Sequence, residues 1–204
     1  SITLPEASLT WYRARPDGPP GRFLVTQPTL SFVRTGMKHL QPHGAAEHLV
    51  VSAGSVVAMG AGIHVMTELG GGAPHYESIV LSVSPAWLQS LLGARGGDSA
   101  RIPAAVAPTP PRLDMMLSPP VSAPDADLWV REAVLVAAGL PRVRALLFRE
   151  AARWGRTEAD RLRAVMQTHS LSPLSVPEYA ALSAMSLTTF KRRFREVFDE
   201  SPGR

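Results

Sequence analysis

The sequence predicts an α+β fold, with a β-barrel or β-sandwich first and an all-α region after it. Between residues 7 and 84, short β-prone runs are separated by glycine and proline at intervals typical of an all-β domain. From residue 125 onward, apolar residues recur at helical spacing instead. The chain has 204 residues, 45% of them hydrophobic, which leaves room for one domain of about 120–150 residues and a smaller second one.

The β-prone runs predict seven strands, at residues 9–14, 22–26, 30–34, 48–52, 56–59, 63–66 and 78–83. Ser84 and Pro85 end the last of them and begin a short helix over residues 86–92. In a barrel, alternate strand residues line the interior, and we expect these to be Phe32, Leu49, Val51, Val57, Met59, Ile79 and Leu81. Small barrels are either packed or hollow, so the sequence leaves the ligand-binding residues unknown.

A proline-rich connector separates the two regions. Seven prolines lie between residues 102 and 124, a density that excludes a helix interior or a central strand and predicts an extended segment. One helical turn is possible near residues 112–117. Further helices are expected at 125–139, 143–154 and 158–168, with Gly139 and Pro141 separating the first two.

Residues 175–198 have the pattern of two short helices joined by a tight turn. Ser175 and Glu178 form a capping box, so a helix is expected from there to about Leu182. Residues 183–185 would make the turn, and Ser186 would cap a second helix that ends at Phe198. Two helices in this arrangement, the second one basic, match the helix-turn-helix plan.

The second of these helices has an apolar and a basic side. At 100° per residue, the apolar stripe contains Phe190, Phe194, Val197 and Phe198. The opposite side contains Thr188, Arg192 and Arg195, flanked by Thr189 and Lys191. Arginine and lysine donate hydrogen bonds to guanine, and threonine contacts a thymine methyl group or a phosphate. This face therefore suits the major groove of DNA.

Residues 174–198 (LSVPEYAALSAMSLTTFKRRFREVF), followed by Ser201-Pro202-Gly203, resemble the first helix-turn-helix of the AraC/XylS transcription regulators. Residues 27–36 and 79–84 are similar to strands of the cupin-like sensor domain of that family. The resemblance places Thr188, Lys191 and Arg192 against the bases. Helical geometry independently selects Thr188 and Arg192 and places Lys191 on the flank. The expected phosphate contacts are Ser186, Thr189 and Arg195.

The resemblance also implies a domain organisation and a set of partners. Residues 1–118 would be the cupin-like sensor domain with its connector, 119–156 a helical linker and dimerisation region, and 157–204 an incomplete DNA-binding domain. The family has two helix-turn-helix units, and this sequence ends after the first. We expect a transcription activator that binds promoter DNA as a homodimer, needs no cofactor, and senses a small-molecule effector or a regulatory protein.

The six histidines raise the question of a metal site, because many cupins are metal enzymes. They are His39, His43, His48, His64, His75 and His169. Metal-binding cupins need an H-x-H pair, which the sequence lacks, and His39 and His43 are expected to bracket a hairpin loop. We therefore expect no metal site and no catalytic residue. Two alternatives stay open: a metal-dependent cupin enzyme, and a protein-interaction module with vestigial DNA binding.

Charge and hydropathy favour a soluble protein with a basic C-terminal end. Residues 1–141 contain nine Lys or Arg and ten Asp or Glu, for a net charge of −1, whereas residues 142–204 contain twelve and seven, for +5. A polyanion would therefore meet the C-terminal end. No run approaches the roughly 18 apolar residues of a membrane span, and no secretory signal is visible. We expect a cytoplasmic protein.

Overall fold

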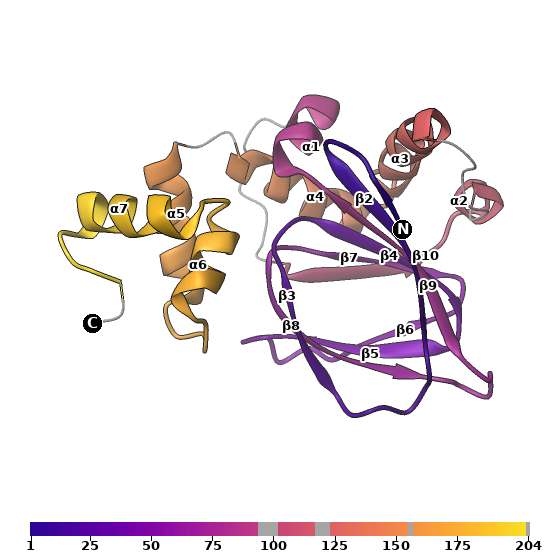
Figure 1. Cartoon of the computed structure of the whole chain (residues 1–204). Coiled ribbons are helices and arrows are strands. Elements are labelled where there is room, and N and C mark those ends of the chain that lie inside the picture. The colour runs from indigo at the N-terminus through magenta and orange to yellow at the C-terminus, as the bar shows by residue number, and fades with distance from the viewer. Residues whose placement is uncertain (94–101, 117–122, 155–156, 203–204) are drawn as a thin grey trace.

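The computed structural model describes residues 1–93, 102–116, 123–154 and 157–202, and it contains two antiparallel sheets followed by helices (Figure 1). The six-stranded sheet has the order β1 (Ile2–Thr3), β2 (Ala7–Ala14), β9 (Tyr76–Val83), β4 (Thr29–Thr35), β7 (Ser55–Met59), β10 (Ala104–Pro108). The four-stranded sheet has the order β3 (Gly21–Val25), β8 (Gly62–Leu69), β5 (Met37–Pro42), β6 (Leu49–Ser52). All seven predicted strands are present.

The helices follow the predicted order along the chain. They are α1 (Pro85–Leu92), α2 (Pro111–Met116), α3 (Ala123–Ala137), α4 (Pro141–Trp154), α5 (Glu158–His169), α6 (Val176–Leu182) and α7 (Leu187–Phe198). The predicted α+β class, with a cupin-like β domain first and a helical region second, is confirmed. None of the helices in the described ranges is long and apolar enough to cross a membrane.

The structure corrects the predicted loop between His39 and His43. Residues Met37–Pro42 form strand β5, which pairs with β8 on one side and β6 on the other. The polar residues of this run are the reason that no strand was predicted. In the structure Lys38 and Leu40 are buried, and His39 between them is exposed. Burial in this strand follows alternation, although one of the inward residues is charged.

The proline-rich connector is also more regular than predicted. Ala104–Pro108 forms strand β10, which pairs with β7 at the edge of the six-stranded sheet, where a strand needs hydrogen bonds on one side only. Pro111 begins α2 and Pro124 lies in the first turn of α3, positions where a helix does not need the missing N–H. Residues 117–122, with Pro119 and Pro120, lie outside the described residues.

The larger core lies between the six-stranded sheet and the helices that cover its outer face (Figure 1). Phe32, which pairs in register with Val56 and Ile79, packs edge-on against Trp129 of α3, with ring centroids 6.3 Å apart. Trp129 is therefore a core residue. Phe32, Ile79 and Leu81 belong to this outer cluster, so predicting them inside the barrel was wrong.

A second, smaller core lies between the two sheets. Val51, Val57 and Met59 are buried there with Leu49 packed against them, as predicted for a barrel interior. Strands β4 and β7 are buried on both faces, because helices cover the outer face and the four-stranded sheet covers the inner one. Their side chains alternate between the two cores, and sequence alternation alone does not tell which face is which.

Candidate nucleic-acid interface and effector cavity

Helix α6 begins at a cap that also contacts the β domain. The carboxylate of Glu178 accepts hydrogen bonds from the backbone N–H and the hydroxyl of Ser175, at 2.7 and 2.8 Å. The guanidinium of Arg22 in β3 donates to the same carboxylate at 2.8 Å and to the carbonyl of Pro173 at 3.1 Å. Arg22 and these Ser175 groups lower the pKa of Glu178 to about 2. The predicted cap of α6 is thus confirmed, and it joins the two regions of the chain.

The turn between α6 and α7 is tight and strained at one residue. The N–H of Met185 donates to the carbonyl of Ala180 at 3.0 Å, and Ala184 has φ +54°, in the left-handed region. Ser186 then caps α7 as predicted, because its hydroxyl accepts from the N–H of Thr189 at 3.2 Å. The two predicted helices and the tight turn between them are present.

One side of α7 holds it on the rest of the helical bundle. Phe190 is buried against Leu162 of α5 and Ala180 of α6, and Phe194 and Val197 are partly buried beside it. Phe198, predicted in the same stripe, is 37% exposed, and its ring centroid lies 4.7 Å from that of Phe194. The stripe therefore orients α7 mainly through Phe190.

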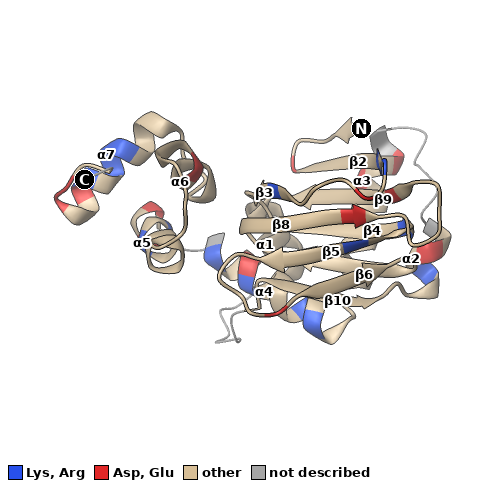
Figure 2. Ribbon diagram, turned by 90° about the horizontal axis from the view of Figure 1, so that it is seen from below, with Lys and Arg blue, Asp and Glu red and all other residues tan. Residues whose placement is uncertain are grey.

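The other side of α7 is basic and exposed, and Figure 2 shows Lys and Arg positions along this helix. Thr188, Lys191 and Arg192 are exposed, as are Ser186 and Arg195, whereas Thr189 is half-buried through its role at the cap. The predicted site residues thus share one helix and its cap. A shallow depression is bordered by Lys191, Arg192, Arg195 and Glu196.

Arg192 and Arg193 differ in how firmly they are held. The guanidinium of Arg192 lies 3.5 Å from the carboxylate of Glu196, a loose pair that leaves its side chain 60% exposed. Arg193 instead pairs with Glu196 and with Glu158 of α5, both at 2.7 Å. Arg193 therefore fixes α7 on the bundle, and Arg192 is the arginine that can turn toward a ligand.

A cavity of about 480 Å³ opens between the two sheets and has one buried charge. The ammonium group of Lys38 donates to Ser31 at 2.8 Å and lies over the ring of Tyr76. Burial lowers its pKa to about 8, so the lysine still carries its charge at neutral pH. The apolar part of the wall consists of Phe23, Leu24, Val25, Met59, Met66 and Val80.

Sequence reasoning missed this cavity and Lys38. Residues Tyr12 and Glu68 also line it, and they come from strands far apart in the sequence. The available signal was a lysine at an inward position of an alternating strand, between the flanking residues Met37 and His39. That signal was hidden because residues 37–42 were not predicted as a strand.

The six histidines do not gather into one cluster. Among the described residues, no group of three or more His, Asp or Glu is placed to hold a metal ion. His64 is buried, with Nε2 3.0 Å from the carbonyl of Gly60. His75 lies on the surface beside Arg13 and Glu77. Strand β8 turns His64 inward, where the hydrogen bond to Gly60 holds it.

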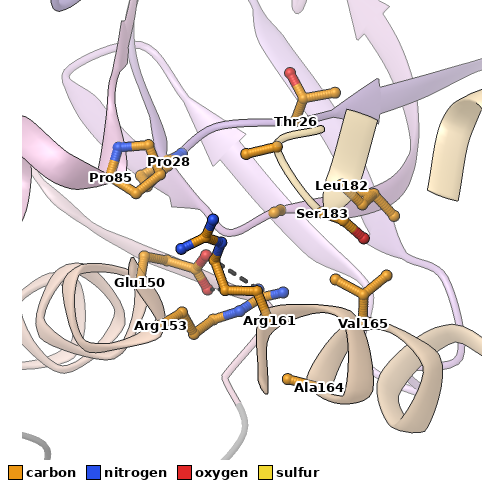
Figure 3. Close-up of a pocket in the computed structure, with 12 residues that line it drawn as sticks. Thr26, Pro28, Pro85, Glu150, Arg153, Arg161, Ala164, Val165, Leu182 and Ser183 are labelled. Atoms are coloured by element: carbon orange, nitrogen blue, oxygen red, sulfur yellow. Dashed lines mark hydrogen bonds and ion pairs between the residues drawn. The ribbon is translucent and has the colours of Figure 1, made fainter. Parts of the chain in front are cut away.

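Helix α4 meets the helix-turn-helix at a small buried junction (Figure 3). The carboxylate of Glu150 is buried there and pairs with Arg149 at 2.9 Å and Arg153 at 3.2 Å. Ser183 and Leu182 from the end of α6 line the opposite wall of a pocket of only about 40 Å³. The β domain, α4 and the end of α6 are therefore packed closely at this point.

Comparison with known proteins supports the fold. No family model matches the sequence, and no curated protein matches it. The structure of ToxT from Vibrio cholerae with bound unsaturated fatty acid is 12% identical over 99% of this chain and 95% of that chain, with a TM-score of 0.50. A second ToxT structure is 12% identical over 97% of this chain and 96% of that chain, with a TM-score of 0.48. The EutQ protein of Clostridium difficile is 10% identical over 39% of this chain and 58% of that one, with a TM-score of 0.33. What the comparison establishes is the shared architecture with ToxT, a cupin-like domain followed by helices.

Proposed function

We propose that this protein is a DNA-binding transcription regulator of the AraC/XylS type, acting as an activator in the cytoplasm. The observation that carries the proposal is the capped helix-turn-helix, whose second helix buries Phe190 and exposes Thr188, Lys191 and Arg192. ToxT, an AraC-family regulator, has the same order of domains. In the proposal, α7 enters the major groove with these three residues toward the bases, and Ser186, Thr189 and Arg195 contact phosphates.

The test is DNA binding by arginine variants of the chain. Duplexes are first selected by the protein from a random-sequence library, and their affinity is then measured by fluorescence anisotropy at several salt concentrations. Arg192→Ala should cost about 1–3 kcal/mol and relax the sequence preference, because a base contact is lost. Arg195→Ala should weaken all duplexes equally and reduce the salt slope by about 1, because a phosphate contact is lost.

A matched control lies on α5. Arg163 is also an exposed helical arginine with one carboxylate partner, Asp160 at 3.3 Å, so Arg163→Ala removes the same charge away from α7. It should leave the sequence preference unchanged. If Arg192→Ala and Arg195→Ala behave like Arg163→Ala, α7 is not the DNA-reading helix and the proposal is wrong.

We further propose that the cavity between the sheets holds an apolar effector with a carboxylate. Lys38 supplies a buried positive charge, and Phe23, Leu24 and Val25 of β3 supply apolar wall. ToxT has been crystallised with an unsaturated fatty acid, a ligand of this chemistry. Oleate should therefore bind in a saturable way, and Lys38→Met should weaken binding about tenfold or more in a titration calorimeter. Equal binding by both proteins would contradict this assignment.

The proposed homodimer would use helix α3. Leu128 and Leu135 are 68% and 51% exposed and lie seven residues apart, on one side of the helix. Helix α4, by contrast, buries Val143 and Leu146 against the sheet and α1. Leu128→Asp should shift the sedimentation coefficient toward that of a monomer, and the control Leu171→Asp, at a 98% exposed loop residue, should not. A wild-type chain that stays monomeric at high concentration would exclude this dimer.

A further inference from the structure

A groove of about 850 Å³ lies between one end of the two sheets and helix α5. Its lining comes from residues 42–45, 61–64 and 167–172, together with Pro103, Arg149, Arg153 and Ala164. None of these residues lines the cavity between the sheets. The volume is within the range of about 300–1,000 Å³ typical of small-molecule sites. The groove is therefore a second candidate site, built from both regions of the chain.

The charge of this groove is positive. Arg149 and Arg153 line it, and none of its described lining residues is Asp or Glu. Glu150, which pairs with both arginines, faces the neighbouring small junction. One carboxylate between two guanidinium groups leaves one positive charge in excess. An anion would complete this arrangement.

The wall of the groove also has polar groups suited to hydroxyls. Gln167 and Ser170 are exposed and Ser172 is half-buried along α5 and the loop after it. His64 is fully buried, and its Nε2 donates to the carbonyl of Gly60. This wall differs from that of the cavity between the sheets, whose lining is richer in apolar side chains.

Two glycines allow close packing of side chains at this corner. A Cβ atom on Gly60 would lie 2.8 Å from the carboxylate of Glu150 and 2.9 Å from the guanidinium of Arg149. A Cβ atom on Gly62, whose φ is +150°, would lie 3.2 Å from the ring of His169. Because these positions lack side chains, the arginine and histidine side chains come close to the backbone at the end of the sheet.

We propose that this groove binds a small hydroxylated anion, such as a sugar phosphate or a hydroxycarboxylate. Its anionic group lies against Arg149 and Arg153, and its hydroxyl groups pair with Gln167, Ser170 and Ser172. Because the groove is formed by the β domain and by α5, the bound anion contacts both and stabilises their packing. The inference does not rest on DNA binding or on the apolar effector.

The experiment is calorimetric titration of the whole chain at low ionic strength with glucose 6-phosphate, gluconate and methyl glucoside. We expect saturable one-to-one binding of at least one of the two anions, and the stronger of them identifies the anionic group. Neutral methyl glucoside should not bind. Arg153→Gln should weaken binding about tenfold or more, because a charge-assisted hydrogen bond is lost.

Matched variants separate this groove from the other basic surfaces. Arg142→Gln removes an exposed arginine of the same helix that lies outside the groove, and it should leave binding unchanged. Lys191→Gln with Arg192→Gln should also leave it unchanged. His43→Glu, at an exposed residue of the groove, should weaken binding without affecting folding. The proposal is overturned if neither anion binds at about 10 mM, or if Arg153→Gln and His43→Glu bind as the wild type does.

Discussion

Replacing Ala184 by glycine should stabilise the helix-turn-helix, contrary to the usual effect of glycine. Ala184 lies between α6 and α7 with φ +54°, and its side chain is exposed. In the left-handed region, the Cβ atom of a non-glycine residue costs about 1–2 kcal/mol. The turn keeps this conformation because the N–H groups of Ala184 and Met185 donate to the carbonyls of Ala181 and Ala180.

The magnitude follows from two opposing terms. Ala184→Gly removes the strain of about 1–2 kcal/mol, and it increases the backbone entropy of the unfolded chain by an equivalent of about 0.4–1 kcal/mol. Little packing is lost, because the methyl group is exposed. The net gain should be about 0.5–1 kcal/mol. Urea unfolding followed by circular dichroism measures it, and slower hydrogen exchange at the Met185 amide, by about two- to fivefold, localises it.

The control is the same substitution three residues earlier. Ala181 lies within α6, so Ala181→Gly should destabilise the protein by about 1 kcal/mol. The two variants should therefore change the unfolding free energy in opposite directions. If Ala184→Gly destabilises as much as Ala181→Gly does, the turn is not left-handed at this residue and the account of its geometry is wrong.

Three further predictions concern buried or paired groups. Phe190→Ala should lower the unfolding free energy by about 3–5 kcal/mol in urea, and the half-exposed Phe198→Ala by only about 1 kcal/mol; equal losses would contradict the packing. Burial lowers the pKa of Lys38 from 10.5 to about 8, so Lys38→Met should raise the unfolding free energy at pH 7, and this gain should shrink between about pH 8 and 10.5. A difference in unfolding free energy that does not change with pH would refute this. Glu178 has a pKa of about 2, so its carboxylate should stabilise the fold fully above about pH 4.5 and progressively less toward pH 2. In an acid titration, the unfolding free energies of the wild type and Glu178→Gln should therefore converge. A constant difference between them would exclude this role for the Arg22 pair.

Local sequence signals predicted the elements of the candidate DNA interface well. Ser186 caps α7 because its hydroxyl accepts from the N–H of Thr189, and Ser175 begins α6 because the carboxylate of Glu178 accepts from the N–H of Ser175. Each of these signals lies within three residues of the cap. The side of α7 that is buried also followed from spacing, with Phe190 at its centre. The assignment of Thr188, Lys191 and Arg192 to bases stays a prediction, as do the domain boundaries, because exposure alone does not identify a partner.

The signals that failed were those that depend on position in a sheet. Residues 37–42 and 104–108 were not predicted as strands, since Lys38, Pro42 and Pro108 are unfavourable in an average strand. One of these strands has a buried lysine that faces a cavity, and the other lies at an edge. Propensity averages over such environments, and it therefore misses the strands that use them.

By itself, the sequence determined the α+β class, the order of the elements and the capped helix-turn-helix, because these depend on contacts within a few residues. Only the tertiary structure decided which face of the six-stranded sheet receives the helices, so that Phe32 meets Trp129 outside the barrel and Lys38 faces its interior. It also brought Arg22 to Glu178, and Arg153 to the same groove as residues 42–45. These pairs come from distant parts of the chain, and their proximity depends on how sheets and helices pack.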